Sequence, residues 1–184
     1  METITNKLYV VSTPIGNLDE FTNRAIHVLK NVDLICCEDT RNTKKLCTHF
    51  NIETPLISIH KFNEYNESDN VIRLLLDGKA VAIVSDAGYP SISDPGGIVI
   101  KKAIDNNIDL EVISGPCALI NGLVGSGLDC YHFYFHGFLS SKHTDRIKEL
   151  KSIKDKKETI IFYEAPHRIY ETLVDIKEVF GNRY

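Results

Sequence analysis

The sequence lacks the patterns that mark secreted, membrane-spanning or zinc-binding proteins. Its five cysteines (36, 37, 47, 117 and 130) include no Cys-x-x-Cys pair, and no histidine lies at a zinc-like interval from them. No apolar run approaches membrane-spanning length, and residues 1–5 do not begin a signal peptide. We therefore expect reduced thiols, no bound metal, no membrane association and a cytoplasmic location.

Motifs that bind nucleotide phosphates are also missing. Neither Gly-x-Gly-x-x-Gly nor Gly-x-x-x-x-Gly-Lys-Ser/Thr follows an expected strand, and the glycines between Gly122 and Gly127 are in another order and follow a helix. The net charge is −4, from 21 Lys and Arg against 25 Asp and Glu, so the whole chain is not an obvious nucleic-acid binder. Net charge by itself still excludes no local basic patch.

The 184 residues do contain a regular alternation of short apolar runs and helical patterns. Asp19 and Ser68 are expected to cap two of the helices, and a charged helix is expected over residues 142–157. The expected strands are 8–13, 33–37, 56–60, 80–84, 110–113, 132–137 and 159–163. This order predicts an α/β fold with a mainly parallel sheet covered by helices on both faces.

Small and polar residues at 125–129 interrupt the alternation, and we place a domain boundary there. Residues 1–127 then form an N-terminal α/β domain, and residues 128–184 contribute two strands and two helices. A two-stranded unit of this size buries little surface. We therefore interpret residues 128–184 as the first part of a C-terminal α/β domain that is truncated in this chain.

Three loops rich in glycine and proline follow apolar strands, at residues 13–17, 85–97 and 114–118. Each loop alone is explained equally well as a simple turn, but ligands of open α/β sheets bind outside the carboxyl ends of the strands, so the three together predict a binding cleft. Asp86 and Asp94 would repel a phosphate without a metal, which favours a neutral or cationic small molecule. Asp94, in Asp-Pro-Gly-Gly, is expected to shape the turn.

Five motifs resemble, in the same order, the signatures of a known protein family. They are Thr13-Pro-Ile-Gly-Asn-Leu18, Cys37-Glu-Asp-Thr-Arg41, Val84-Ser-Asp-Ala-Gly-Tyr-Pro-Ser-Ile-Ser-Asp-Pro-Gly96, Ser114-Gly-Pro-Cys-Ala118 and Phe162-Tyr-Glu-Ala-Pro-His-Arg168. The family is that of the small-subunit ribosomal RNA methyltransferases I. It lies within the tetrapyrrole methylases, the class III S-adenosylmethionine-dependent methyltransferases. The resemblance runs from about Lys7 to the end of the chain.

The resemblance implies a homodimeric, two-domain enzyme. It would use S-adenosylmethionine to methylate the ribose 2′-hydroxyl of a decoding-site cytidine in small-subunit rRNA, supplied as free rRNA or as the assembled subunit. By motif position, the cofactor cleft between the domains would be lined by Pro14, Ser85, Asp86, Ala87, Gly88, Tyr89, Cys117 and Ala118, and closed by Phe162, Tyr163 and Glu164. Family members usually continue for a further stretch, so part of the pocket on the adenine side is expected to be absent.

Methyl transfer to a hydroxyl needs in-line alignment and a base that accepts the proton. The candidates for the base are Glu38, Asp39, His60, Glu164 and His167, each of which could equally be a cap or an ion-pair partner. Arg41 and Arg168 could orient RNA phosphates or pair with the neighbouring acids. The reaction itself requires no metal.

Residues 142–168 include eight Lys and Arg but only five Asp and Glu. This bias suits a phosphate-binding track or a solvated helix face equally well. Two other functions remain open: a class III methyltransferase of a tetrapyrrole or another small acceptor, and a non-catalytic RNA-binding module. The string Cys37-Glu-Asp-Thr-Arg41, which is not a signature of the tetrapyrrole enzymes, favours rRNA methylation.

Overall fold

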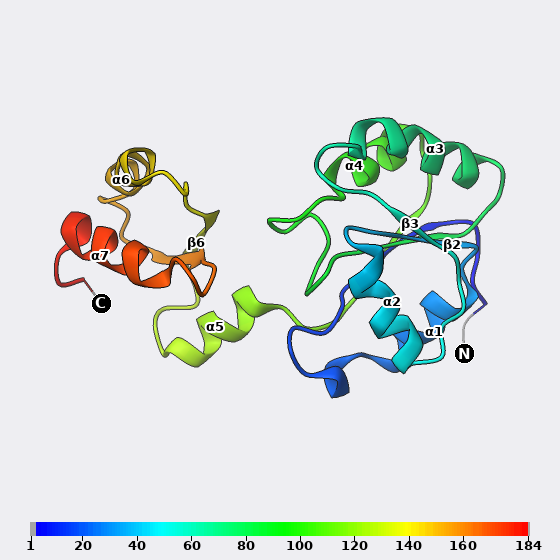
Figure 1. Ribbon diagram of the computed structural model, residues 1–184, viewed down its shortest axis with the longest axis horizontal. Helices are drawn as coiled ribbons and strands as arrows, with labels where there is room; N and C mark the ends of the chain where they lie inside the picture. Colours follow the sequence, from blue (N-terminus) through cyan, green and yellow to red (C-terminus); the bar gives the residue numbers. More distant parts are fainter. Residues whose placement is uncertain (1–2, 184) are drawn as a thin grey trace. The chain divides into compact units, whose positions relative to one another are not determined.

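The computed structural model describes residues 3–183, which divide into two compact units at Ala118 and Leu119 (Figure 1). The expected domain boundary lay after residue 127, at the end of the helix α5 (Ala118–Ser126). The structure places nearly all of α5 with the second unit. One contact that ties it there is the backbone N–H of Leu119, which donates to the Tyr163 hydroxyl at 3.1 Å.

The first unit is built on a five-stranded sheet in the order β3-β2-β4-β1-β5. The strands are β1 (Leu8–Val11), β2 (Leu34–Cys37), β3 (Leu56–Ser58), β4 (Val81–Val84) and β5 (Leu110–Ile113), and every pairing is parallel. The expected α/β class with a mainly parallel sheet is confirmed. Val11 is in register with both Val84 and Ile113, so β1, β4 and β5 end at the same level.

Helices cover both faces of this sheet (Figure 1). On one face lie α1 (Asn23–Asn31) and α2 (Thr40–His49), and on the other lie α3 (Glu64–Leu76) and α4 (Gly97–Asp105). Because strand residues alternate between the faces, Val11 packs in the core under α1 and α2 while Val10 packs in the core under α3 and α4. The strands are therefore buried on both sides, as their apolar runs indicated.

Two of the expected helix caps are wrong. The side chain of Thr22 caps α1 by accepting a hydrogen bond from Ala25, whereas Asp19 lies in the short 3-10 helix η1 (Leu18–Glu20). Ser68 is buried inside α3, which already begins at Glu64. The earlier start of α3 coincides with a tertiary contact, because the Glu64 carboxylate binds the amino end of α4, and no local sequence signal records such a contact.

The second unit pairs β6 (Phe133–Phe138) with β7 (Thr159–Tyr163) in parallel, with an irregularity between Phe135 and Gly137. Its other helices are α6 (His143–Ser152) and α7 (Ile169–Phe180). Helix α6 stops short of the expected end at residue 157 because the chain turns at Ile153, whose side chain is buried. Within residues 3–183, no helix is both long and apolar enough to cross a membrane.

Candidate functional site

The loops that follow β1 and β4 are joined by backbone hydrogen bonds. The N–H of Thr13 donates to the carbonyl of Gly88 at 2.9 Å, and the N–H of Gly88 donates to the carbonyl of Thr13 at 3.0 Å. The buried hydroxyls of Thr13 and Ser85 donate to the carbonyls of Ser85 and Gly88, each at 3.0 Å. Pro14, also buried, follows directly. This part of the loop edge is therefore held rigidly by the chain itself.

The loop after β5 joins the same edge. The Ser12 hydroxyl donates to the carbonyl of Pro116 at 2.8 Å, and the N–H of Gly115 donates to the hydroxyl of Tyr89 at 3.1 Å. A Cβ on Gly115 would lie 3.0 Å from the Cβ of Ser12, so a larger residue would push the two loops apart. Cys117, half-buried, follows at the start of α5. The three glycine- and proline-rich loops thus form one connected surface.

A fourth loop, which follows β2, reaches this surface through the start of α2. The side-chain amide of Asn42 donates to the Asp86 carboxylate at 2.8 Å. The hydroxyl of Ser58 holds the carbonyl of Glu38 at 2.9 Å. The sheet order explains this approach, because β2 is the neighbour of β4 although β3 and α3 separate them in the sequence. Glu38 and Asp39 therefore belong to the same edge as Asp86.

Three carboxyl groups, those of Glu38, Asp86 and Asp94, influence one another at this edge. Burial, together with the charges of Glu38 and Asp86, raises the pKa of Asp94 to about 6. Burial and the charge of Asp86 also raise the pKa of Glu38. Such perturbed groups cluster at functional sites because closely placed like charges are costly unless a ligand offsets them. From the sequence, Asp94 was expected to repel phosphate together with Asp86 and to shape the turn, but it was not among the predicted cofactor-binding residues.

Asp39 differs sharply from its neighbour Glu38. Hydrogen bonds from the Arg41 side chain and backbone hold the pKa of Asp39 at about 2. The Arg41 guanidinium lies 2.6 Å from the Asp39 carboxylate and is otherwise exposed. Asp39 also caps α2 by accepting from the N–H of Arg41. A carboxylate with so little affinity for protons is a poor general base, so the two acids in this motif are not equivalent.

The buried carboxylate of Glu64 supports the long loop after β4 from behind. One of its oxygens accepts from the N–H groups of Gly96 at 2.9 Å and Ile98 at 2.8 Å, at the amino end of α4. The loop it supports is conformationally demanding, since Ser91 and Ser93 have φ values of 67° and 64°. Sequence reasoning missed Glu64, because nothing near it in the chain indicates a partner more than thirty residues away.

A hollow of about 340 Å³ lies against the loop edge. Its walls combine loop residues with the side of α2, and they mix apolar, amide, basic and acidic groups. The lining residues are Thr13, Pro14, Gly16, Leu18, Asn42, Thr43, Lys45, Leu46, His49, Ser85 and Asp86. Within residues 3–183, no group of His, Cys, Asp and Glu is arranged to hold a metal ion.

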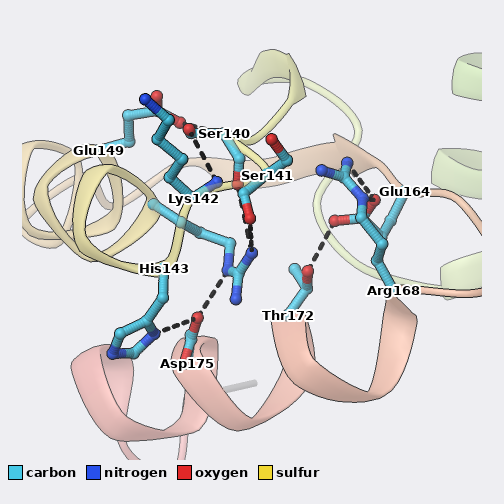
Figure 2. A network of polar contacts seen from close by, with 10 residues as sticks. Ser140, Ser141, Lys142, His143, Glu149, Glu164, Arg168, Thr172 and Asp175 are labelled. Atoms are coloured by element: carbon cyan, nitrogen blue, oxygen red, sulfur yellow. Dashed lines mark hydrogen bonds and ion pairs between the residues drawn. The ribbon is translucent and has the colours of Figure 1, made fainter.

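In the second unit, Glu164 is committed to a local network at the end of β7 (Figure 2). Its carboxylate accepts from the Thr172 hydroxyl at 2.6 Å, from the Ala165 N–H at 2.7 Å and from the Arg168 guanidinium at 2.6 Å. Burial alone would raise the pKa of Glu164, but these hydrogen bonds outweigh it and keep the pKa below its usual range. Glu164 and Arg168 therefore form an ion pair with each other, and the lowered pKa makes Glu164 a weak proton acceptor.

The other residues of the second unit that the sequence predicted for the site lie in different surroundings. Phe162 is half-buried and its ring lies against His136, with centroids 5.5 Å apart. Tyr163 contacts Phe135 edge to face, with centroids 4.9 Å apart, and its hydroxyl accepts from Leu119. His167 lies exposed on the turn before α7. In the first unit, Ala87 and Ala118 are exposed on the loop edge.

A buried ion pair fixes the loop after β6 (Figure 2). The Arg146 guanidinium donates to the Asp175 carboxylate at 2.6 Å and to the carbonyls of Ser140 and Ser141, each at 3.3 Å. His143 adds a contact to Asp175 at 3.1 Å. This network joins α6 to α7 and to the β6–α6 loop.

The sequence of this chain is similar to those of a known protein family and of several curated proteins. The family described as "Tetrapyrrole (Corrin/Porphyrin) Methylases" matches residues 7–184. Among curated proteins, "Ribosomal RNA small subunit methyltransferase I" of Bacillus subtilis is 48% identical over 176 residues, covering 96% of this chain and 60% of that protein. The protein of the same name from Buchnera aphidicola is 48% identical over 181 residues, covering 98% of this chain and 64% of that protein.

Solved structures agree at the level of the fold. The uroporphyrin-III-C-methyltransferase of Thermus thermophilus superposes with a TM-score of 0.64 at 18% identity, covering 97% of this chain and 74% of that one. The chain spans 60% and 64% of the length of the two curated relatives, so it matches only part of each. The family match over nearly the whole chain confirms the resemblance read from the five motifs. The chain belongs to the tetrapyrrole (corrin/porphyrin) methylase family.

Proposed function

We propose that the protein transfers the methyl group of S-adenosylmethionine to the ribose 2′-hydroxyl of a decoding-site cytidine in small-subunit ribosomal RNA. The observation that carries the proposal is the connected loop edge with the carboxyl groups of Glu38, Asp86 and Asp94. Support for the acceptor comes from the curated relatives, which are named as small-subunit rRNA methyltransferases at 48% identity.

The residues of the edge fit the cofactor chemically. S-adenosylmethionine carries a sulfonium cation, and when bound it supplies a methyl group activated for attack by a nucleophile. Asp86 and Asp94 place negative charge beside the rigid turns, which suits a cation and repels phosphate. We infer that Pro14, Ser85 to Tyr89, and Cys117 with Ala118 form the cofactor wall of the first unit, as their motifs predict, and that Asp94 joins them.

Glu38 is the group best suited to accept the proton of the ribose hydroxyl. Its pKa is raised by burial and by Asp86, which brings it closer to neutral pH than that of an ordinary glutamate. Asp39 and Glu164 are held in hydrogen bonds that lower their pKa values. In the proposed step the hydroxyl oxygen would form a bond to the methyl carbon as the methyl–sulfur bond breaks, with S-adenosylhomocysteine as the leaving group. The proton of the hydroxyl would pass to Glu38.

Calorimetry with S-adenosylmethionine tests the cofactor assignment, and methyl transfer to small ribosomal subunits that lack the modification tests the acceptor. We expect saturable heat with the cofactor and label on the ribose of a decoding-site cytidine. Absence of cofactor binding would leave a non-catalytic RNA-binding module as the better reading. Transfer to a tetrapyrrole and not to RNA would overturn the proposed acceptor.

The variant Glu38→Gln tests whether Glu38 acts as the general base or instead helps to bind the cofactor. We expect kcat to fall by about 100-fold or more while the affinity for S-adenosylmethionine stays unchanged, since the amide keeps the size of the side chain but cannot accept the proton. Asp39→Asn is the matched control, and it should lower kcat far less. An equal fall in both variants, or a loss of cofactor affinity in Glu38→Gln, would contradict the assignment.

A further inference from the structure

Helix α2 exposes a basic face although the chain as a whole is acidic. Between Thr40 and His49 the helix carries Arg41, Lys44, Lys45 and His49 but no Asp or Glu, while the net charge of the chain is −4. All four of these side chains are exposed. The positive charge is therefore a local feature, placed directly after the motif that contributes Glu38 to the loop edge.

The side chains of Lys44 and Lys45 form no ion pair within the described part of the chain, unlike those of Lys79 and Lys101. Lys79 lies 3.0 Å from Asp33, and Lys101 lies 3.1 Å from Asp105. Within residues 3–183, no carboxylate lies within ion-pair distance of Lys44 or Lys45. These two ammonium groups are therefore available to an external anion.

Two adjoining hollows connect this basic face with the loop edge. The outer one, of about 440 Å³, is lined by Arg41, Lys44, Lys45, Thr48 and His49. The inner one is the hollow of about 340 Å³ described above, and the two share Lys45 and His49. A chain lying across α2 would thus have a continuous path from Lys44 to Ser85 and Asp86.

The basic tract at residues 142–168 offers less to a polyanion than its sequence suggests. Arg146 is buried against Asp175, and Arg168 is held by Glu164. Lys148 lies 3.5 Å from Asp145. Three of the eight Lys and Arg in this tract are thus already paired, and the tract also carries five Asp and Glu. Helix α2 carries no Asp or Glu, which favours it as the positively charged surface.

Building on the proposed function, we propose that the exposed face of α2 binds the phosphate backbone of the substrate RNA, with Lys44 and Lys45 as its main contacts, and that the groove beside it leads the acceptor nucleotide to the loop edge. Lysines bind phosphates as point charges and release counterions from the strand, so affinity should depend strongly on salt. The amides, hydroxyls and apolar side chains of the inner hollow suit a nucleoside better than a second phosphate.

The test uses the double variant Lys44→Gln/Lys45→Gln and a fluorescein-labelled single-stranded oligoribonucleotide, with affinity measured across salt concentrations in the absence of cofactor. We expect roughly tenfold weaker binding and a salt slope smaller by about 1.4, because each phosphate contact on a single strand contributes about 0.7. KM for unmodified small subunits should rise while S-adenosylmethionine affinity is unchanged. Lys79→Gln/Lys101→Gln, which removes the same charge from exposed lysines elsewhere in this unit, should leave RNA binding unchanged.

An unchanged affinity and salt slope in the α2 variant would overturn the inference. So would an equal loss in the Lys79→Gln/Lys101→Gln control, or a larger loss in Lys151→Gln/Lys154→Gln on the other basic tract. Because RNA binding is measured without cofactor, the two proposals fail separately. Weaker RNA binding by the α2 variant, with no methyl transfer by the unaltered protein, would support the RNA surface and overturn the proposed function.

Discussion

At the scale of single residues, the acids of the loop edge differ because their surroundings differ. Asp39 accepts hydrogen bonds from Arg41, which lower its pKa, while Asp94 is half-buried near two other carboxylates, and burial together with their charges raises its pKa to about 6. Residue type and spacing alone cannot separate these cases. Hydrogen-bond partners and burial decide which carboxylate holds a proton near neutral pH.

Asp94→Asn tests this difference through stability. The folded-state pKa of about 6 lies above the ordinary aspartate value of 3.8, so between these two pH values the native state binds a proton that the unfolded chain does not. The contribution of Asp94 to stability therefore falls as the pH rises through that window. We expect Asp94→Asn to raise the free energy of unfolding at pH 7 by on the order of 1 kcal/mol, a value reduced by solvent screening.

The measurement is urea unfolding at pH 7 and at about pH 3.5, just below the lower end of the window. The stabilisation by Asp94→Asn should disappear at the lower pH, and Asp109→Asn, which removes an exposed carboxylate of the same unit, should show no such change. The same variant should bind S-adenosylmethionine more weakly at pH 7. Destabilisation at pH 7 would contradict the assignment of Asp94 as an electrostatically strained group.

At the scale of elements, α4 depends on a residue from another helix. Its N-cap, Gly96, has no side chain, and the carboxylate of Glu64 on α3 takes over this role by accepting from Gly96 and Ile98. Gly96 itself needs its freedom, because its φ is 121° and a Cβ there would lie 3.0 Å from the Ile83 side chain. The long loop after β4 is thereby anchored at its far end.

Glu64→Ala should destabilise the protein by about 2 kcal/mol, because it leaves two amides at a buried helix end without an acceptor. It should also weaken S-adenosylmethionine binding, since the loop that carries Asp86 and Asp94 loses its anchor. Glu64→Gln keeps an acceptor oxygen and should recover most of both losses. Thermal unfolding and calorimetry measure the two effects, and an alanine variant as stable as the unaltered protein would refute the capping role.

The ion pair between Arg146 on α6 and Asp175 on α7 is expected to stabilise the second unit. Asp175→Ala leaves the Arg146 guanidinium buried without its carboxylate, which typically costs about 3 kcal/mol or more. Hydrogen exchange should then show loss of protection in β6 and β7 but not in β1 and β4. The double variant Arg146→Met/Asp175→Leu removes both charges and should regain much of the stability. If the single and double variants were equally unstable, packing and not charge would explain the loss.

At the scale of the whole molecule, the two units have very different cores. The first has apolar clusters on both faces of a five-stranded sheet, whereas the second has a cluster centred on Leu139, Leu150 and Val179 beside a two-stranded sheet. Small cores contribute less stabilisation relative to the conformational entropy lost on folding. The second unit is therefore expected to be the less stable one.

Hydrogen exchange in increasing urea tests this expectation. Amides of β7 should become exposed at a lower urea concentration than those of β1 and β4, so unfolding should proceed in two steps. S-adenosylmethionine should shift the step that includes the loop edge to higher urea concentration if that edge binds the cofactor. A single cooperative transition that includes all strands would contradict the prediction.

The sequence by itself determined the α/β class, the parallel direction of the strands and the family. Alternating strands and helices force crossover connections, so the loops at 13–17, 85–97 and 114–118 open at one edge whatever the strand order. Only the tertiary structure decided which other residues meet there. Placing β2 beside β4 brings Glu38 to Asp86 and Asp94, and packing α3 against α4 brings Glu64 to Gly96. Periodicity and spacing describe neighbours along the chain, whereas charge coupling and burial depend on neighbours across the sheet.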